Sequence, residues 1–306
     1  MLPFREKVVS LQANIYSEFY NYLTLFSLLL YSMDRFRYFD VRVFDAFIEK
    51  FAERYVRQRS SVNMDVLKKA EMMDCGMDIS ALLRVIKSNS CYVDAVREEG
   101  RTPSQLKDIY RSDLGELLTT YYFEEKLPEG ERYIIPLKNI STRERYDMPG
   151  RGLDAIGYRV EADGSYTLLL SETKVSDEKQ NPPQVVHSTT DSIYKTQKLH
   201  HDNTPLVLQR LTDYVRKLSS GSDMAILGCI VLWMDNGETD RYKVTYGCGL
   251  VRDSKCGEKE RDFGKMYSHS DEFRPGEIDF AILSFTEKTI SETVDMFYHR
   301  VMEIVK

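Results

Sequence analysis

The pattern of hydrophobic and polar residues divides the chain into two parts. Over residues 5–95, apolar residues recur at helical spacing, as Val41, Phe44 and Phe47 do, and the stretch contains no proline and a single glycine. Helix-breaking residues then cluster at positions 99–104, with the sequence EGRTPS. We therefore predict an all-helical N-terminal domain over residues 1–100, followed by a second domain over residues 101–306.

The second part contains segments with the period of strands. Beyond residue 130, stretches in which apolar and polar residues alternate are separated by stretches with helical spacing. This order of elements predicts an α/β fold with a mixed central sheet flanked by helices. The predicted strands are residues 132–138, 153–160, 166–174, 225–234, 242–251 and 278–284, and the predicted helices are residues 104–127, 187–219 and 287–304.

Composition and charge narrow the class of protein. The chain has 306 residues, of which 42% are hydrophobic and 29% charged, so we expect a folded protein with a substantial core. The net charge of −6 means that any nucleic-acid contact must come from a local basic surface. The five cysteines lack disulfide or zinc-ligand spacing, no export signal is visible, and the longest uncharged apolar run, residues 19–33, is too short to cross a bilayer. We expect a cytoplasmic protein with no membrane partner.

The candidate chemistry lies in three neighbouring segments of the second part. Glu116 belongs to a predicted helix, Asp154 begins one predicted strand, and Glu172 and Lys174 end the next. Because side chains alternate along a strand, Glu172 and Lys174 share a face with the apolar residues that precede them. A carboxylate and an ammonium on a buried face are costly unless they are paired or meet an ion. Asp154 is the candidate partner for this pair.

The connection between the two strands decides whether the acids meet. A three-residue loop over residues 162–164, with Gly164 in the left-handed region, pairs Asp154 with Glu172. A two-residue turn at 163–164 pairs Asp154 with Thr173 instead and puts the acids on opposite faces. The candidate chemistry therefore requires the three-residue loop or a bulge. Two carboxylates that converge in this way form a hard-oxygen site suited to Mg²⁺, with Mn²⁺ as a substitute, and not to zinc.

Such an ion polarises a phosphoryl oxygen and lowers the pKa of a bound water, so phosphodiester hydrolysis is the expected reaction. A nearby lysine orients the water or offsets charge in the transition state. The predicted roles are Asp154 and Glu172 as metal ligands, the Thr173 backbone carbonyl as a further ligand, Glu116 as an outer or second-metal ligand, and Lys174 as the electrostatic catalyst.

Two basic residues are candidate DNA contacts. Lys195, in a predicted helix, faces either the phosphate backbone or solvent, and Arg151, just before the Asp154 strand, either touches phosphate or ties down its own loop. A nuclease that lacks both a visible recognition module and a net positive charge should bind mainly the phosphate backbone of DNA, so we expect low sequence specificity and strong salt dependence.

The order of these residues resembles the active-site motif of the PD-(D/E)XK nuclease superfamily. The segments DLGELL, GRGLDAIGY and LSETK resemble the sequences of the HamA/AbpA-type nucleases of Hachiman antiphage defence. The resemblance covers residues 105–250, with Leu153 in the place of the superfamily's proline. It implies a restriction-endonuclease-like core and a Mg²⁺-dependent DNA nuclease in the bacterial cytoplasm, acting beside a superfamily 2 helicase. The N-terminal part is then expected to dock the partner or to shape the DNA channel.

Two other functions fit the same residues. One is a nuclease fold that is catalytically silent and serves as a binding or scaffold subunit, for which the acids would not be needed. The other is a phosphoesterase that acts on RNA or nucleotides and uses the same ions, but contacts the 2′-hydroxyl.

Overall fold

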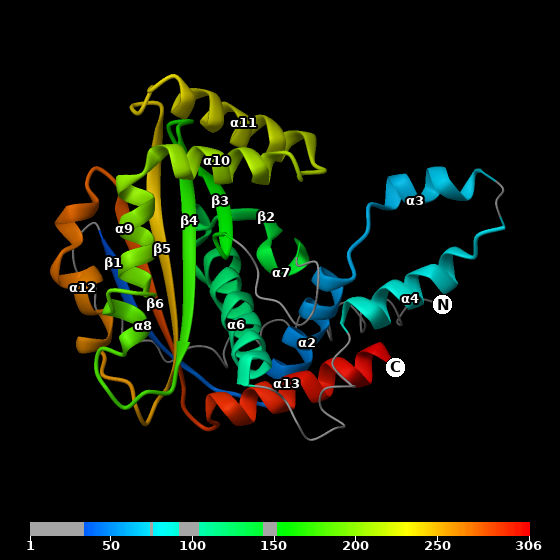
Figure 1. The fold of residues 1–306 in the computed structure, drawn as a ribbon, viewed down its shortest axis with the longest axis horizontal. Coiled ribbons are helices and arrows are strands. Elements are labelled where there is room, and N and C mark those ends of the chain that lie inside the picture. Colours follow the sequence, from blue (N-terminus) through cyan, green and yellow to red (C-terminus); the bar gives the residue numbers. More distant parts are fainter. Residues whose placement is uncertain (1–33, 74–75, 92–103, 143–151) are drawn as a thin grey trace, which may run out of the picture.

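A six-stranded mixed sheet forms the centre of the computed structural model, which describes residues 34–73, 76–91, 104–142 and 152–306 (Figure 1). The strand order is β1-β6-β5-β4-β3-β2, with β1, β6, β5 and β4 parallel and with β3 and β2 antiparallel to their neighbours. The predicted α/β class with a mixed sheet is confirmed. The strands are β1 (Arg35–Val41), β2 (Ile134–Lys138), β3 (Ala155–Val160), β4 (Tyr166–Ser176), β5 (Tyr242–Asp253) and β6 (Glu277–Phe285).

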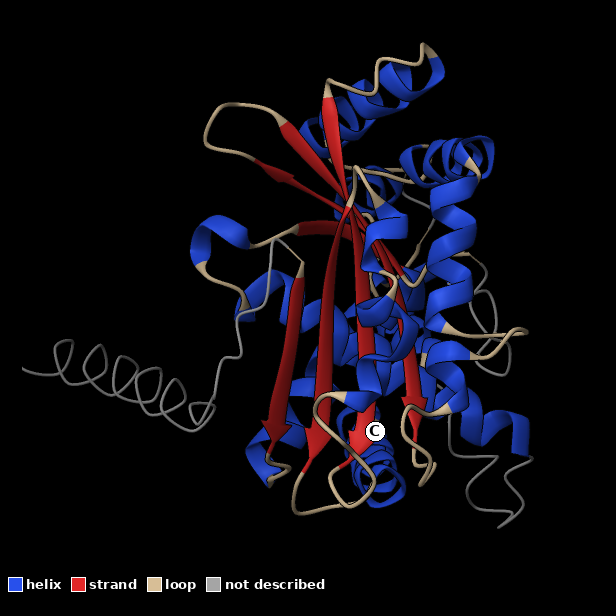
Figure 2. Ribbon diagram, turned by 90° about the vertical axis from the view of Figure 1, so that its left-hand side faces the viewer, coloured by secondary structure: helices blue, strands red, loops and turns tan. Residues whose placement is uncertain are grey.

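Helices cover both faces of the sheet, and each face has its own hydrophobic core (Figures 1 and 2). Side-chain alternation in β4 shows the division, because Leu169 belongs to one core and Leu168 and Leu170 to the other. The first core is covered by α2 (Asp45–Arg59), α6 (Ser104–Tyr121), η1 (Tyr122–Lys126) and α13 (Ile290–Val305), and the second by α8 (Gln184–His187), α9 (Ile193–Asp202), α10 (Thr204–Val215), α11 (Gly221–Asp235) and α12 (Gly264–Ser268).

The remaining elements are short or lie away from the sheet. Figure 1 shows α3 and α4 extending outward from the body of the molecule. No helix in the described ranges combines the length and apolarity needed to cross a membrane. These further elements are α3 (Met64–Glu71), α4 (Ile79–Ser90), α7 (Asn139–Thr142), η2 (Glu129–Glu131), η3 (Arg261–Phe263) and η4 (Ser270–Phe273).

The prediction of an all-helical N-terminal part is wrong for the described residues. Residues 35–41 form β1, which pairs with β6 from Arg35 opposite Asp279 to Val41 opposite Phe285. Phe36 and Tyr38 pack on the second core and Phe39 and Val41 on the first, so this segment has apolar side chains on both faces, as a strand between two layers of helices does. Helix α2 then packs on α13, so this part shares the first core with the C-terminal helix. The predicted boundary between residues 100 and 101 lies within 92–103, outside the described residues.

One predicted strand, residues 225–234, is instead part of helix α11. A continuous apolar run fits a buried strand or a helix equally well, so its ends decide. Ser220 caps the helix by accepting a hydrogen bond from the Asp223 amide, and only one stripe of the helix is buried, at Leu227, Ile230 and Met234. The other predicted strands correspond to β2 through β6, and the predicted closing helix corresponds to α13.

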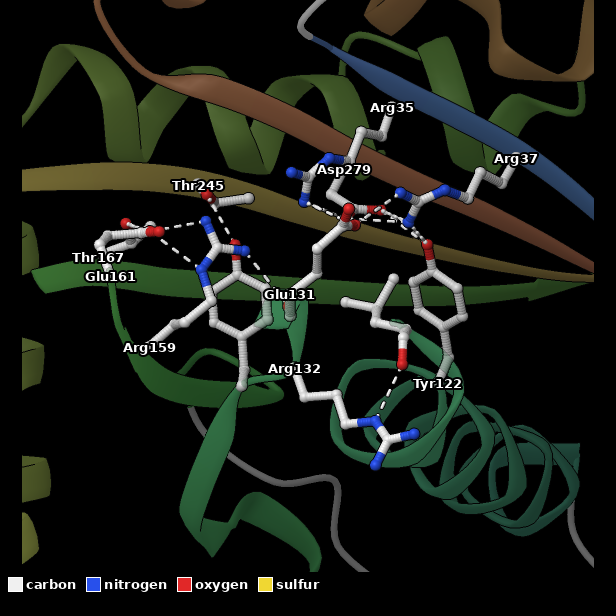
Figure 3. A network of polar contacts seen from close by, with 12 residues as sticks. Arg35, Arg37, Tyr122, Glu131, Arg132, Arg159, Glu161, Thr167, Thr245 and Asp279 are labelled. Atoms are coloured by element: carbon white, nitrogen blue, oxygen red, sulfur yellow. Dashed lines mark hydrogen bonds and ion pairs between the residues drawn. The ribbon is translucent and has the colours of Figure 1, made fainter. Parts of the chain in front are cut away.

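A network of polar side chains fastens the edge strand β1 to the rest of the sheet (Figure 3). The buried carboxylate of Asp279, on β6, accepts a hydrogen bond of 2.8 Å from the Tyr122 hydroxyl and pairs with Arg37 at 3.4 Å. Arg35 and Arg37 both reach Glu131 as well. Because these charges are satisfied by one another, we assign the network a structural role.

Glycines allow α6 to lie close to the centre of the sheet. A side chain at Gly249, on β5, would overlap the hydroxyl of Thr119 and approach its Cγ2 to 2.6 Å. A side chain at Gly115, on α6, would approach the methyl groups of Thr173 and Val175 on β4 at 3.2 and 2.6 Å. The face of β4 that carries Thr173 is therefore covered by α6.

We expect the substitution Gly249→Ala to lower the free energy of unfolding by about 1–3 kcal/mol, because the added methyl overpacks the contact with Thr119. Urea denaturation measures this change. The Thr119→Ala, Gly249→Ala double variant should lose less than the sum of the single variants. As a control, Gly228→Ala adds a methyl to open space in α11 and should stabilise the protein by about 1 kcal/mol. Equal losses at positions 249 and 228 would contradict this packing.

Candidate active site

The β3–β4 hairpin has the register that brings Asp154 beside Glu172. Its loop is closed by hydrogen bonds of 2.9 Å from the Glu161 amide to the Ser165 carbonyl and from the Gly164 amide to the Glu161 carbonyl. Gly164 has a φ of 83°, in the left-handed region that favours glycine. The ladder pairs Ala155 with Ser171, so Asp154 lies opposite Glu172. The three-residue loop predicted from the sequence is confirmed.

Asp154 is held at the end of β4 by a backbone group. Its Oδ2 accepts a hydrogen bond of 2.6 Å from the amide of Thr173, just beyond the last β3–β4 ladder pair. In an extended strand, the N–H and the C=O of one residue face the same neighbouring strand. The carbonyl of Thr173 therefore faces the edge at which Asp154 lies, as its predicted role as a ligand requires.

Glu172 and Lys174 form an ion pair on the opposite face from α6. Glu172 is buried, and its Oε1 lies 3.2 Å from the Lys174 ammonium. Lys174 also donates a hydrogen bond of 2.8 Å to Asp191, an exposed residue just before α9. The partner that the sequence analysis assigned to this pair was Asp154. Asp191 was missed, because a loop residue 17 positions away gives no signal in the strand pattern.

The surroundings set the charge of both groups. Burial raises the pKa of the Glu172 carboxyl above its ordinary value, although the nearby charges of Lys174 and Arg210 oppose this rise. Burial lowers the pKa of the Lys174 ammonium, but the carboxylates of Glu172 and Asp191 outweigh it and the net pKa is raised. Lys174 is therefore protonated at neutral pH and acts as a positive charge, not as a general base.

Glu116 comes from a different element than these residues. It is buried on α6, which covers the face of β4 with Thr173, whereas Glu172 and Lys174 project from the other face. Within the part of the chain that the structure describes, no three His, Cys, Asp or Glu side chains come together as ligands for a metal ion. The role of Glu116 as an outer or second-metal ligand stays a prediction.

The two predicted DNA contacts differ in what the structure says of them. Lys195 is an exposed residue of the first turn of α9 and follows the cap residue Ser192, whose hydroxyl accepts a hydrogen bond from the Lys195 amide. Its contact with DNA stays a prediction. Arg151 lies outside the described residues.

A polar groove begins at the segment that carries Asp154. It lies between α10 and the β2–α7 connection, and Gly152 and Leu153 form part of its wall. Basic side chains line it as well, namely Lys138, Arg210 and Lys217, together with the acid Asp213. The sequence gives no signal for this surface, because its residues come from separate segments and form no motif.

The donor atoms at the site suit a hard divalent ion. Magnesium sites commonly use one or two carboxylates and leave the other positions to water and substrate phosphate. The carboxylates of Asp154 and Glu172 and the carbonyl of Thr173 supply such a set, although a cage of three acidic ligands is not formed by the described residues. The residues present therefore fit Mg²⁺ or Mn²⁺.

In EDTA, the difference in melting temperature between the Glu172→Gln variant and the wild type should grow in favour of the variant as the pH rises from 4 to 8. The pKa of Glu172 is raised in the folded state, so its contribution to stability is full below the unfolded pKa and is lost as the pH passes the folded pKa. Thermal unfolding at several pH values measures this trend.

Glu292→Gln is the control, because its effect on stability should change with pH in the opposite direction. Hydrogen bonds from Thr289 lower the pKa of the Glu292 carboxyl, so its contribution is present above the unfolded pKa and lost in acid. If Glu172→Gln is no more stable than the wild type at neutral pH, or is less stable, the result contradicts the assigned burial of the carboxylate.

Comparisons with known proteins agree with the resemblance seen in the motifs. The profile of the family described as HamA matches residues 18–301, which is nearly the whole chain. Neither the curated proteins nor the solved structures contain a significant match. The match includes both the N-terminal part and the hairpin with Asp154 and Glu172. The chain belongs to the HamA family of Hachiman antiphage defence proteins.

Proposed function

We propose that this HamA-family protein is a metal-dependent deoxyribonuclease that hydrolyses phosphodiester bonds with low sequence specificity. The observation that carries the proposal is the position of Asp154 opposite the buried Glu172, with the charged Lys174 on the same strand end. A buried acid that is kept beside a cation at the open end of a hairpin is costly for folding alone. The same arrangement is useful for binding an ion and a phosphate.

Each residue has a separate part in the proposed reaction. Asp154, Glu172 and the carbonyl of Thr173 would hold Mg²⁺ or Mn²⁺, and the amide of Thr173 orients the Asp154 carboxylate. When bound, the ion polarises a phosphoryl oxygen and makes a water more acidic. The Lys174 ammonium orients the attacking water or offsets negative charge that develops on the phosphoryl oxygens. Because Lys174 stays protonated, it does not accept the proton of that water.

The proposal includes a partner and a setting that follow from the family resemblance. Membership in the HamA family supports a role in antiphage defence. We infer that a superfamily 2 helicase restrains or delivers the nuclease, as the resemblance implies. DNA would be bound mainly through its phosphates, because the chain has a net charge of −6 and its basic residues are local.

The experiment is cleavage of supercoiled and linear plasmid DNA by the full chain with Mg²⁺, Mn²⁺ or EDTA. We expect cleavage in either metal and none in EDTA. Lys174→Gln removes the charge at the reacting phosphate and should lower the rate by about 100-fold or more. Glu172→Gln removes a ligand and should abolish cleavage. Glu287→Gln, at an exposed carboxylate, is the matched control and should cleave as the wild type does.

If the wild type alone is inert, the assay is repeated with the co-encoded helicase and ATP. Inertness under both conditions would contradict the nuclease and favour a silent scaffold subunit. Faster cleavage of RNA than of DNA, with the same loss in both variants, would favour a phosphoesterase that acts on RNA.

A further inference from the structure

Arg210, on α10, lies where the polar groove meets the candidate active site. Its side chain lines the groove together with Gly152 and Leu153, next to Asp154 in the chain. Its positive charge also acts on the Glu172 carboxylate from the second-core side of the sheet. Arg210 therefore stands between the wall of the groove and the proposed metal ligands.

Buried side chains connect Arg210 to the sheet. Gln197, on α9, is fully buried and donates hydrogen bonds of 3.0 and 2.7 Å to the carbonyls of Leu170 and Gly247. Its amide oxygen lies 3.4 Å from Nδ1 of the buried His200. Nε2 of His200 in turn contacts the guanidinium of Arg210.

This chain of contacts assigns the tautomer of His200. The amide nitrogen of Gln197 already faces two carbonyls, so its oxygen must accept a hydrogen from Nδ1 of His200. Nε2 then carries a lone pair, which accepts a hydrogen from Arg210. Burial, together with the charge of Arg210, lowers the pKa of His200 to about 4, so the ring is neutral at physiological pH.

A neutral partner has a consequence for the arginine. His200 holds the guanidinium in place without cancelling its charge, unlike a carboxylate partner. The other N–H groups of a guanidinium form a planar fork that matches two oxygens of a phosphate. A cation so fixed at the end of a groove beside two carboxylates suits the phosphate of a DNA strand.

We propose that Arg210 is a phosphate-binding residue that holds the DNA strand next to Asp154 and Glu172, and that His200 and Gln197 are positioning residues that fix its guanidinium. The inference rests on the proposed nuclease function and adds the surface by which the substrate enters. The groove beside α10 is then the path of the strand toward the reacting phosphate.

The first test measures DNA binding without cleavage. A labelled duplex is titrated with the full-length Glu172→Gln protein in EDTA, at several salt concentrations. Arg210→Ala in this background should weaken binding. It should also make the negative slope of log K against log salt shallower by about 0.9, the value of one lost phosphate contact. Arg261→Ala is the control, since this exposed arginine pairs with Glu258, and it should leave the slope unchanged.

The second test uses cleavage in Mg²⁺ to examine the positioning residue. Arg210→Ala should lower the rate by about 100-fold, and His200→Phe by about 10-fold. In the Arg210→Ala background, His200→Phe should cause no further loss, because its effect passes through the arginine. Arg210→Lys keeps a charge without the fork and should retain the salt slope while losing rate.

The phosphate contact would be overturned if Arg210→Ala left the salt slope unchanged. It would also be overturned if Arg210→Lys cleaved DNA at the rate of the wild type. Additive losses for His200→Phe and Arg210→Ala would overturn the positioning role. If binding depends on Arg210 but no metal supports cleavage, the nuclease proposal fails while the phosphate contact stands.

Discussion

The burial of the Glu172 carboxylate at the end of β4 is the constraint around which the site is arranged. An ionised carboxylate in a buried position needs cations or an ion close by. The chain provides Lys174 on the same strand face and Arg210 from α10, while Asp154 is brought opposite by the hairpin. Burial still keeps the pKa of Glu172 above its ordinary value, so the pair alone does not fully compensate the charge. A divalent ion would complete the compensation, which is why we regard the arrangement as functional.

The rest of the fold holds this strand end in place. Strand β4 lies between β5 and β3, and α6 packs on β4 at Gly115 and on the neighbouring β5 at Gly249. The β4–α8 connection is fixed by Arg252, a fully buried residue whose guanidinium donates to the carbonyls of Ser176, Glu178 and Gln180. The polar network around Asp279 fastens the far edge of the sheet. Strand β4 is therefore paired on both sides, covered on one face by α6 and followed by an anchored connection.

Local patterns were enough to predict the strand pair and its register. The position of Gly164 between Glu161 and Ser165 indicates the loop, and alternation along β4 indicates which side chains share a face. The helical spacing that begins at Val41 does not reach back over residues 35–41, which form a strand, so a single helical assignment fails there. The apolar run of α11 fits a strand as well as a helix by its period, and only the cap at Ser220 distinguishes the two.

The other parts of the site depend on contacts between distant segments. Asp191 meets Lys174 only because the chain returns to β4 through α8, and Arg210 approaches Glu172 only because α10 packs over the sheet. No spacing rule in a single sequence encodes such approaches. Glu116 comes from α6, which covers the face of β4 that carries Thr173, and its role as an outer or second-metal ligand stays a prediction.

The most direct measurement is a titration of the full-length protein with Mn²⁺, followed by electron paramagnetic resonance at neutral pH. Our account predicts bound Mn²⁺ in the wild type, displacement of that ion by Mg²⁺, and loss of binding in the Asp154→Asn and Glu172→Gln variants. Absence of binding in the wild type, or equal binding in all three proteins, would contradict a metal site at the end of β4.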